Sequence, residues 1–530
     1  MNLNELRRLK NQSMLFSDLL DKIANDYGDQ PAVTCGGTLN YLQLRDISQR
    51  NALALANLGV QKGDKVVLWA SNCLEWLPAF FGVAMAGGVA VLLNYGLNAS
   101  DVTSLTGQVA AKWAIMGGSG IYAKDPECAK QALIAAGVPA EHVISLYDLF
   151  RESMNASADV DRAAYDALKK QNHPEDTQCI IFTTGTTSLP KAVQLSSRGI
   201  ILNALLAVEH LLDGDLYDNI CVALPLFHSY GLLASIFALS ANCHLILAET
   251  IHPVSIAKLI AEKKAGMLLS VGAVCSTMAD FPDFEEKVSP TVRRILLGGG
   301  FTDPEELRRL ENKLHGGIVL TCYGLSECSP GISCNVSSDP FEWRANTAGR
   351  IIQGIDARIW REGDGFLGVG EIGELVVKSP CNMNGYLGLP PEEQPIDADG
   401  WLHTGDLAAF TEEGLLQLKG RVKDIIKRAG EGISPAEIEE ALLKEPSIRE
   451  AKVVGVPDPI WGETVEACVV LSDGELDEKR LRLSLRKKLS PQKVPNHIFA
   501  FQAFPVKTNG KADQLRLKEM VMERLRALKD

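Results

Sequence analysis

Between about residues 30 and 300, the chain alternates short apolar runs with longer segments of helical periodicity. Helical patterns occur at Asn203–Leu212 and Ser255–Lys264. The apolar runs lie at Val66–Trp69, Ile180–Phe182, Cys221–Leu224 and His244–Leu247. A strand without polar alternation is buried on both faces, which is typical of parallel sheets covered by helices. The pattern therefore predicts an α/β fold with parallel sheets flanked by helices.

The sequence changes character from about residue 345 to 420, where short strands alternate with turns such as Arg361–Gly365. These turns are typical of hairpins and predict a β-rich subdomain. Charge density then rises through Arg421–Asp424, and a smaller α+β pattern follows. We therefore expect an N-terminal domain of residues 1–421 and a C-terminal domain of residues 422–530.

Composition excludes several classes of protein. The 530 residues carry a net charge of −13, which argues against nucleic acid as the main partner. The twelve cysteines include no C-x-x-C pair, so neither a zinc site nor a disulfide framework is indicated. The first residues have no apolar core of a signal peptide. We expect a cytoplasmic protein with reduced thiols.

One segment has the length of a membrane span. Trp76–Leu93 is 18 residues long and has no charged residue. It is interrupted by a proline and three glycines, and it ends in the β-type run Val89–Leu93. It is therefore predicted to be a buried helix, a glycine turn and a buried parallel strand, with no membrane span.

The segment Thr183–Lys191 packs five hydroxyl side chains, a glycine and a lysine into nine residues, directly after an apolar run. Polyphosphate oxygens only accept hydrogen bonds, so hydroxyl and backbone N–H groups at the end of a strand suit them. The spacing is not that of a Walker P-loop. A threonine-rich segment is also typical of an ordinary turn, and the segment alone leaves both interpretations open.

Five more segments combine turns with reactive or aromatic side chains. Each alone is also typical of an ordinary loop or of a packed core residue. They are Leu224–Gly231, Leu297–Phe301, Tyr323–Glu327, Trp401–Leu407 and Thr508–Lys511.

In their order along the chain, these segments resemble the adenylate-forming superfamily of acyl-CoA synthetases, carrier-loading adenylation domains and luciferases. The likeness covers nearly the whole chain and extends to Glu371–Leu375, Asn384–Tyr386, Gly420–Arg421, Ile433–Glu439, Val454–Asp458 and Trp461–Glu463. The resemblance implies that ATP activates a carboxylate to an acyl-adenylate with release of pyrophosphate. The acyl group then passes to a thiol, often that of coenzyme A.

The resemblance also implies roles for residues around ATP. The phosphate loop Thr183–Lys191 would embrace the β- and γ-phosphates, Asp406 would accept hydrogen bonds from the ribose, and Glu327 would hold Mg²⁺. The adenine would be sandwiched between the glycine run, Gly299–Phe301, and Tyr323. The full implied ATP set is Thr183, Thr184, Gly185, Thr186, Thr187, Lys191, Gly299, Gly300, Phe301, Tyr323, Gly324, Ser326, Asp406 and Arg421.

For the chemistry, the resemblance implies a mobile C-terminal domain. Lys511 would reach the α-phosphate and the substrate carboxylate during adenylation, and Lys423 would lie at the hinge. His228 would lie at the mouth of the acyl pocket. The loop brought in for the thiol step, and thus for coenzyme A, would be Arg428, Ala429, Gly430 and Glu431.

The chain departs from the family pattern in the phosphate loop, where Ser188 and Ala192 occupy positions usually held by glycine. If residue 188 needs a positive φ, a serine there costs roughly 1–2 kcal/mol. This departure bears on the rate of the reaction and leaves its type unchanged.

The favoured acceptor is free coenzyme A, because the synthetase pattern fills all 530 residues. One alternative is an enzyme that loads the thiol of a carrier protein. Another is a nucleotide-binding sensor or pseudoenzyme, supported only by Ser188. Tyr230, Phe301 and the absence of an evident aspartate to pair an amino group favour a fatty or aromatic acid as substrate.

Overall fold

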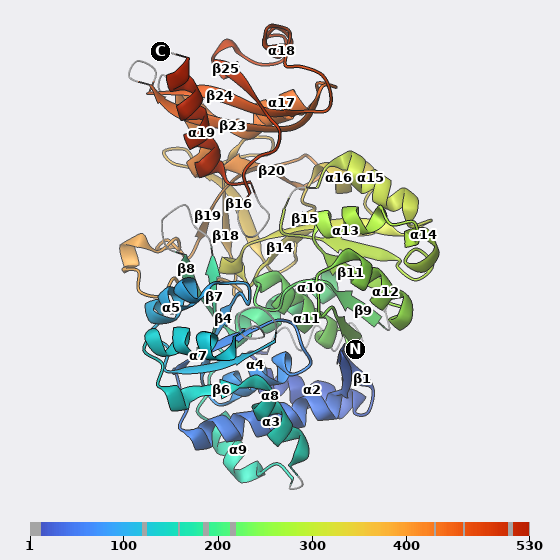
Figure 1. Ribbon diagram of the computed structural model, residues 1–530, viewed down its shortest axis with the longest axis vertical. Helices are drawn as coiled ribbons and strands as arrows, with labels where there is room; N and C mark the ends of the chain where they lie inside the picture. Colours follow the sequence, from blue (N-terminus) through green and yellow to red (C-terminus); the bar gives the residue numbers. More distant parts are fainter. Residues whose placement is uncertain are drawn as a thin grey trace. The chain divides into compact units, whose positions relative to one another are not determined.

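The computed structural model describes residues 12–118, 125–156, 159–183, 190–211, 219–300, 302–428, 431–458, 462–506 and 512–528. The chain divides into two compact units. The first unit comprises Met1–Ala357 with Val377–Leu402, and the second comprises Arg358–Val376 with His403–Asp530. Figure 1 shows the fold and labels many of the helices and strands.

A six-stranded sheet in the first unit has the order β6-β5-β3-β4-β7-β8. All its neighbouring pairs are parallel except the β7–β8 hairpin, whose register sets Thr183 opposite Lys191. The strands are β3 (Lys65–Ala70), β4 (Val89–Leu93), β5 (Trp113–Gly117), β6 (Val143–Ser145), β7 (Thr177–Thr183) and β8 (Lys191–Ser196). The phosphate loop is thus the direct connection between two neighbouring strands.

A nine-stranded sheet in the same unit has the order β15-β14-β13-β12-β11-β9-β10-β1-β2. Its six central strands pair in parallel, and the antiparallel pairs lie at its two ends. The strands are β1 (Pro31–Cys35), β2 (Gly37–Asn40), β9 (Asn219–Val222), β10 (His244–Leu247), β11 (Met267–Ser270), β12 (Arg294–Leu297), β13 (Ile318–Gly324), β14 (Gly331–Cys334) and β15 (Arg350–Ile351). The predicted parallel sheets are confirmed.

Helices pack on both sheets of this unit (Figure 1). They are α2 (Phe16–Tyr27), α3 (Tyr41–Leu58), α4 (Trp76–Met85), α5 (Ala99–Gln108), α7 (Pro126–Ala135), α8 (Leu146–Asn155), α9 (Arg162–Lys169), α10 (Ser197–Leu211), α11 (Ser229–Ser240), α12 (Pro253–Lys263), α13 (Gly272–Ala279), α14 (Phe284–Lys287), α15 (Pro304–Lys313) and α16 (Phe341–Asn346). Their apolar side chains and those of the strands form buried clusters.

The apolar segment Trp76–Leu93 folds as predicted into α4, a turn and β4. Every residue of both elements is buried, and β4 pairs with β3 and β7. A Cβ atom at Gly82 would lie 2.5 Å from the Cβ of Asn51, so the glycine allows α4 to pack closely on α3. Among the described residues, no helix has both the length and the apolar character that a membrane crossing requires.

Asn72 connects the two sheets of the first unit. It follows β3 and is 4% exposed. Its Nδ2 donates to the carbonyl oxygens of Leu224 (2.9 Å) and Ala248 (2.8 Å), and its Oδ1 accepts from the N–H of Leu226 (2.9 Å). The loop that follows β9 is therefore held by a side chain from the other sheet.

The second unit contains two five-stranded sheets. The first, in the predicted β-rich region, has the order β17-β16-β18-β19-β20, with β16 (Asp356–Arg361), β17 (Gly365–Phe366), β18 (Gly373–Lys378), β19 (Leu402–Phe410) and β20 (Leu416–Arg421). The second contains β21 (Ile426–Arg428), β22 (Glu431–Ile433), β23 (Ile448–Asp458), β24 (Gly462–Leu471) and β25 (His497–Phe501). Helices α17 (Pro435–Leu443), α18 (Glu478–Leu485) and α19 (Gln514–Ala527) complete this unit. The domain boundary at residue 421 stays a prediction.

Candidate functional site

Candidate residues of the first unit lie where strands end. Thr183 ends β7, the glycine run follows β12, and Tyr323 and Gly324 end β13. In open α/β sheets, ligands bind outside the carboxyl ends of the strands. Five of the predicted ATP residues lie outside the described part of the chain, namely Thr184, Gly185, Thr186, Thr187 and Phe301.

Three side chains from distant segments meet beside the phosphate loop. Lys191 is the first residue of β8, and its Nζ lies 4.6 Å from the centroid of the Tyr386 ring. The Tyr386 hydroxyl donates a 2.7 Å hydrogen bond to Oε1 of Glu327. We call these residues the Lys191–Tyr386–Glu327 cluster. One phenol thus contacts a cation through its ring and a carboxylate through its hydroxyl.

Backbone pairing places Tyr386 in this cluster. The stretch that carries it runs along β8, where the N–H of Gln194 donates to Gly385 O (3.1 Å) and that of Leu387 donates to Ala192 O (2.9 Å). The sequence drew attention to the motif containing Tyr386 and assigned it no role. Its position depends on a strand pairing between residues far apart in the chain.

Glu327 lies in a single 3-10 turn, Ser326–Cys328, that follows β13. The hydroxyl oxygens of Ser326 and Ser229 lie 2.8 Å apart, which ties the turn to the first residue of α11. Gly324 is required before the turn, because a Cβ there would lie 1.7 Å from the carbonyl oxygen of Pro330. The local fold therefore fixes the carboxylate near β13.

The glycines that follow β12 serve two different purposes. A Cβ at Gly298 would lie 2.8 Å from Cε1 of Tyr230 and 2.9 Å from Sγ of Cys322, so this glycine makes room for the protein's own side chains. Gly299–Gly300 are exposed, and a Cβ at either would meet no atom closer than 3.6 Å. The backbone that a flat ligand could approach is therefore this exposed pair.

Tyr230 is packed into the first unit. Burial, followed by the nearby Cys322, raises its pKa well above the usual value. Its hydroxyl donates to the carbonyl oxygen of Leu296 at 3.1 Å. Burial also raises the pKa of the Cys322 thiol to about 12. Both groups are thus neutral at physiological pH.

His228 is the exposed residue that precedes α11. Its ring centroid lies 5.2 Å from that of Phe227, which in turn lies 5.7 Å from Tyr95 in an edge-on arrangement. The loop behind it is held by Asn72. The histidine therefore extends from a fixed, aromatic-lined turn.

In the second unit, Asp406 and Arg421 are directly opposite each other on β19 and β20. Arg421 Nε lies 2.9 Å from Asp406 Oδ1. Asp406 is 6% exposed, and the Arg421 side chain is 47% exposed. The resemblance assigned both residues to ATP, and the hairpin register pairs them.

Glu374 supports the turn that leads to Asp406. Its Oε2 lies 2.8 Å from His403 Nδ1, and its Oε1 accepts a 2.8 Å hydrogen bond from the N–H of Gly405. The Thr404 hydroxyl donates to the carbonyl oxygen of Leu375, the residue after Glu374, at 2.6 Å. The sequence singled out the motif around Glu374, but only the pairing of β18 with β19 shows what its carboxylate contacts.

The residues predicted for domain movement and coenzyme A are described only in part. Lys423 is exposed on the 3-10 turn Val422–Asp424. Arg428 ends β21, and its Nη1 donates to the carbonyl oxygen of Gln492 at 2.8 Å. Lys511, Ala429 and Gly430 lie outside the described residues, and only the backbone of Glu431 is described.

The donor groups fit a magnesium ion that shares its ligands with a substrate. Within the described ranges, no three His, Cys, Asp or Glu side chains form a group that could hold a metal ion. Mg²⁺ is usually held by one or two carboxylates together with substrate phosphates and water. Glu327 has one oxygen bound to Tyr386 and offers the other.

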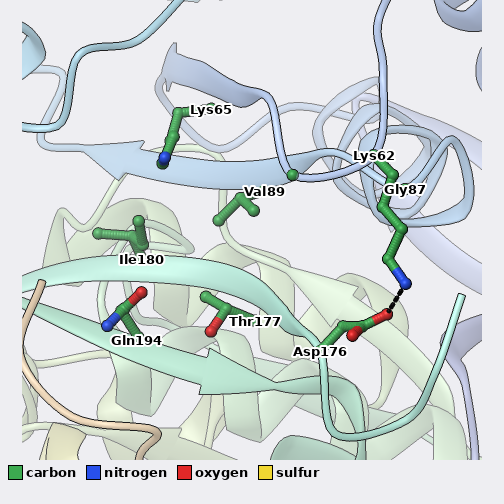
Figure 2. Close-up of a pocket in the computed structure, with 9 residues that line it drawn as sticks. Lys62, Lys65, Gly87, Val89, Asp176, Thr177, Ile180 and Gln194 are labelled. Carbon is green, nitrogen blue, oxygen red and sulfur yellow. Dashed lines mark ion pairs between the residues drawn. The ribbon is translucent and has the colours of Figure 1, made fainter.

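A surface cavity of about 220 Å³ lies on the six-stranded sheet, at the strand ends opposite those that carry Thr183 (Figure 2). Lys62 and Asp176 form an ion pair of 2.7 Å at its rim. It is lined by Lys62, Gly63, Lys65, Gly87, Val89, Asp176, Thr177, Ile180 and Gln194. Since Lys65, Val89 and Thr177 begin their strands, the cavity lies at the amino ends of the strands and is separate from the candidate site.

Two family models match the chain. Residues 20–387 match the AMP-binding enzyme family, and residues 437–511 match the AMP-binding enzyme C-terminal domain.

Individual proteins match over nearly the whole length. The chain is 30% identical to a long-chain-fatty-acid–CoA ligase of Bacillus subtilis, over 95% of this chain and 94% of the relative. It is 28% identical to a medium-chain acyl-CoA ligase of Rattus norvegicus, over 92% and 84%. Among solved structures, ATP-bound MatB from Rhodopseudomonas palustris superimposes with a TM-score of 0.82 at 25% identity, over 95% of this chain and 98% of that one.

Proposed function

The chain belongs to the AMP-binding enzyme family, and on this premise we propose that it is an AMP-forming acyl-CoA synthetase. It activates a fatty or aromatic acid with ATP and transfers the acyl group to coenzyme A. The observation that carries this proposal is the Lys191–Tyr386–Glu327 cluster, where a cation and a carboxylate flank one phenol beside the phosphate loop. Such an arrangement suits a polyanion that arrives with a divalent cation.

In the first step, an oxygen of the substrate carboxylate attacks the α-phosphorus of ATP, and the bond to pyrophosphate breaks. Two anions must approach each other, so positive charge has to be in place beforehand. Lys191 would supply charge at the end of the phosphate loop, and Lys511 would supply it at the reacting oxygens. Glu327 would hold Mg²⁺, which neutralises charge on the phosphates.

The nucleoside is held by different groups. Asp406 would accept hydrogen bonds from the ribose hydroxyls, and its ion pair with Arg421 orients the carboxylate. The exposed Gly299–Gly300 backbone and the Tyr323 ring would contact the adenine. These contacts fix the orientation of the α-phosphate relative to the acid.

In the second step, the thiol of coenzyme A attacks the acyl carbonyl, and AMP leaves. The product is the thioester, and the thiol proton passes to solvent. A rotation about Lys423 would remove Lys511 and bring the loop of residues 428–431 to the acyl-adenylate. His228 would lie at the entrance through which the acid arrives.

The test is carboxylate-dependent exchange between ATP and labelled pyrophosphate over a panel of acids. The panel contains saturated acids of increasing length and several aromatic acids. Exchange with one class, followed by thioester formation with coenzyme A, is the expected result. An absence of exchange with every acid would instead favour a nucleotide sensor, and thioester formation only on a carrier protein would change the assigned acceptor.

A further inference from the structure

We propose that Tyr386 is a positioning residue that keeps the cation and the carboxylate of the phosphate site apart and orients each of them. The inference rests on the proposed function, in which Glu327 holds Mg²⁺ and Lys191 contacts phosphate. It assigns to Tyr386 two separable tasks, one for its hydroxyl and one for its ring.

The hydroxyl orients the metal carboxylate. It donates to Oε1 of Glu327 at 2.7 Å, which leaves Oε2 as the oxygen available to a metal. A neutral donor fixes the carboxylate without cancelling its charge, unlike a lysine or arginine partner. Hydrogen bonds of this kind to metal-binding side chains change metal affinity by 10- to 100-fold in other proteins.

The ring holds the lysine. Lys191 Nζ lies 4.6 Å from the ring centroid, within the range of a cation–π contact. Tyr386 is 9% exposed, so water has little access to this contact. The ring therefore holds the ammonium group in place. Because the ring carries no net charge, this contact does not neutralise the lysine.

The position of the ring also prevents a competing interaction. Lys191 and Glu327 carry opposite charges and both contact Tyr386. If Tyr386 did not engage both side chains, they could form an ion pair, and each charge would be partly neutralised before ATP and Mg²⁺ arrive. Tyr386 thus preserves both charges for the substrate.

Tyr386 is rigid enough for this task. Its N–H donates to Gln394 Oε1 (2.7 Å), and Gln394 Nε2 donates back to Tyr386 O (3.0 Å). Three residues before it, the N–H of Met383 donates to the carbonyl oxygen of Glu327 (2.8 Å). One short segment therefore fixes both the tyrosine and the turn that carries the carboxylate.

Two substitutions separate the two tasks. Tyr386→Phe keeps the ring over Lys191 and removes the hydroxyl, whereas Tyr386→Leu removes both contacts. The matched control is Tyr41→Phe, because Tyr41 is 1% exposed and its hydroxyl donates to Cys243 O at 3.0 Å elsewhere in the same unit. The melting temperature of each variant, compared with that of the control, separates a loss of folding from a local effect.

The readout is ATP binding measured by calorimetry at increasing Mg²⁺, without acid or coenzyme A. Tyr386→Phe should raise the half-saturating Mg²⁺ concentration about tenfold and leave metal-free ATP binding unchanged. Tyr386→Leu should also weaken metal-free ATP binding, because Lys191 then pairs with Glu327. Adding Glu327→Gln to Tyr386→Leu should restore the metal-free binding, since no ion pair can form.

Each part of the proposal has an outcome that overturns it. An unchanged Mg²⁺ requirement in Tyr386→Phe removes the orienting role of the hydroxyl. Equal metal-free binding in wild type and Tyr386→Leu, or no recovery in the double variant, removes the separating role of the ring. If the affinity of the wild-type protein for ATP did not depend on the Mg²⁺ concentration, this would instead contradict the metal role of Glu327 and thus the proposed function.

Discussion

The two units position their candidate ligand-binding groups in different ways. In the first unit, Lys191, Tyr386 and Glu327 come from three segments that are far apart in the chain. In the second unit, Asp406 and Arg421 face each other across a single hairpin. The first arrangement exists only when tertiary packing is complete, whereas the second is fixed by local strand register.

The difference indicates that the tasks proposed for the two regions need different kinds of structural support. Groups that handle phosphate and metal must be held apart and oriented by long-range contacts, because their charges would otherwise neutralise one another. A carboxylate proposed to bind ribose hydroxyls needs only a fixed orientation, which a neighbouring arginine on the same sheet can provide. Four substitutions test how far this distinction holds.

The largest effect is expected for Lys511→Ala, which separates the two half-reactions. Pyrophosphate exchange should fall by about 10³-fold, because a cation that stabilises the transition state is lost. Thioester formation from a supplied acyl-adenylate should stay close to the wild-type rate. Equal loss in both assays would contradict the moving-domain account.

Asp406→Ala should come next. It removes the proposed ribose contact and leaves Arg421 without its partner, so kcat/KM for ATP should fall by about 10²-fold. The half-saturating Mg²⁺ concentration should not change, because Glu327, the proposed metal ligand, belongs to the other unit. A Mg²⁺ effect as large as that of Tyr386→Phe would break the distinction between the two regions.

Glu374→Ala tests whether the local hairpin is sufficient by itself. The Gly405 N–H and His403 would lose their acceptor, at a cost of about 2 kcal/mol in the free energy of unfolding. We expect the KM for ATP to rise about tenfold, while exchange at saturating ATP changes little. Glu374→Gln retains an acceptor for Gly405 and should recover most of the affinity; a KM for ATP that stays at the wild-type value in Glu374→Ala would show that the hairpin alone positions Asp406.

The smallest effect is expected for Ser188→Gly in the phosphate loop. If position 188 needs a positive φ, relief of about 1–2 kcal/mol of strain should speed adenylation by a few-fold and leave ATP affinity nearly constant. Steady-state rates with a saturating acid provide the measurement. Loss of adenylation would show that the serine hydroxyl itself contacts phosphate.

Much of the fold was predictable because a strand that is buried on both faces has a continuous apolar sequence. The runs that form β3, β7 and β10 were recognised by their apolar residues. The glycines of Trp76–Leu93 indicated that this segment is a helix, a turn and a strand. The end of β9 was predicted two residues late. The apolar run continues through Leu224, whereas the strand ends at Val222, just before the turn at Pro225.

The candidate site residues could be named from the sequence and stay predictions, whereas the contacts that support them could not be predicted. Glu327, Asp406 and Arg421 belong to motifs whose order carries the resemblance. The partners Tyr386 and Glu374 were seen as parts of motifs, yet their contacts follow from strand pairings that no local pattern specifies. Gly298 shows the same limit, because only packing reveals that it accommodates Tyr230.

Asn72 has a consequence for how the enzyme accommodates different acids. The Leu226 amide donates to Asn72, a side chain that follows a strand of the other sheet, so exchange of this amide with solvent requires the two sheets to separate locally. The base of the loop before His228 thus opens as one cooperative unit with the junction between the sheets. Adjustment to a bulkier acid would therefore come from the side chains of Phe227 and His228, while the loop backbone stays in place.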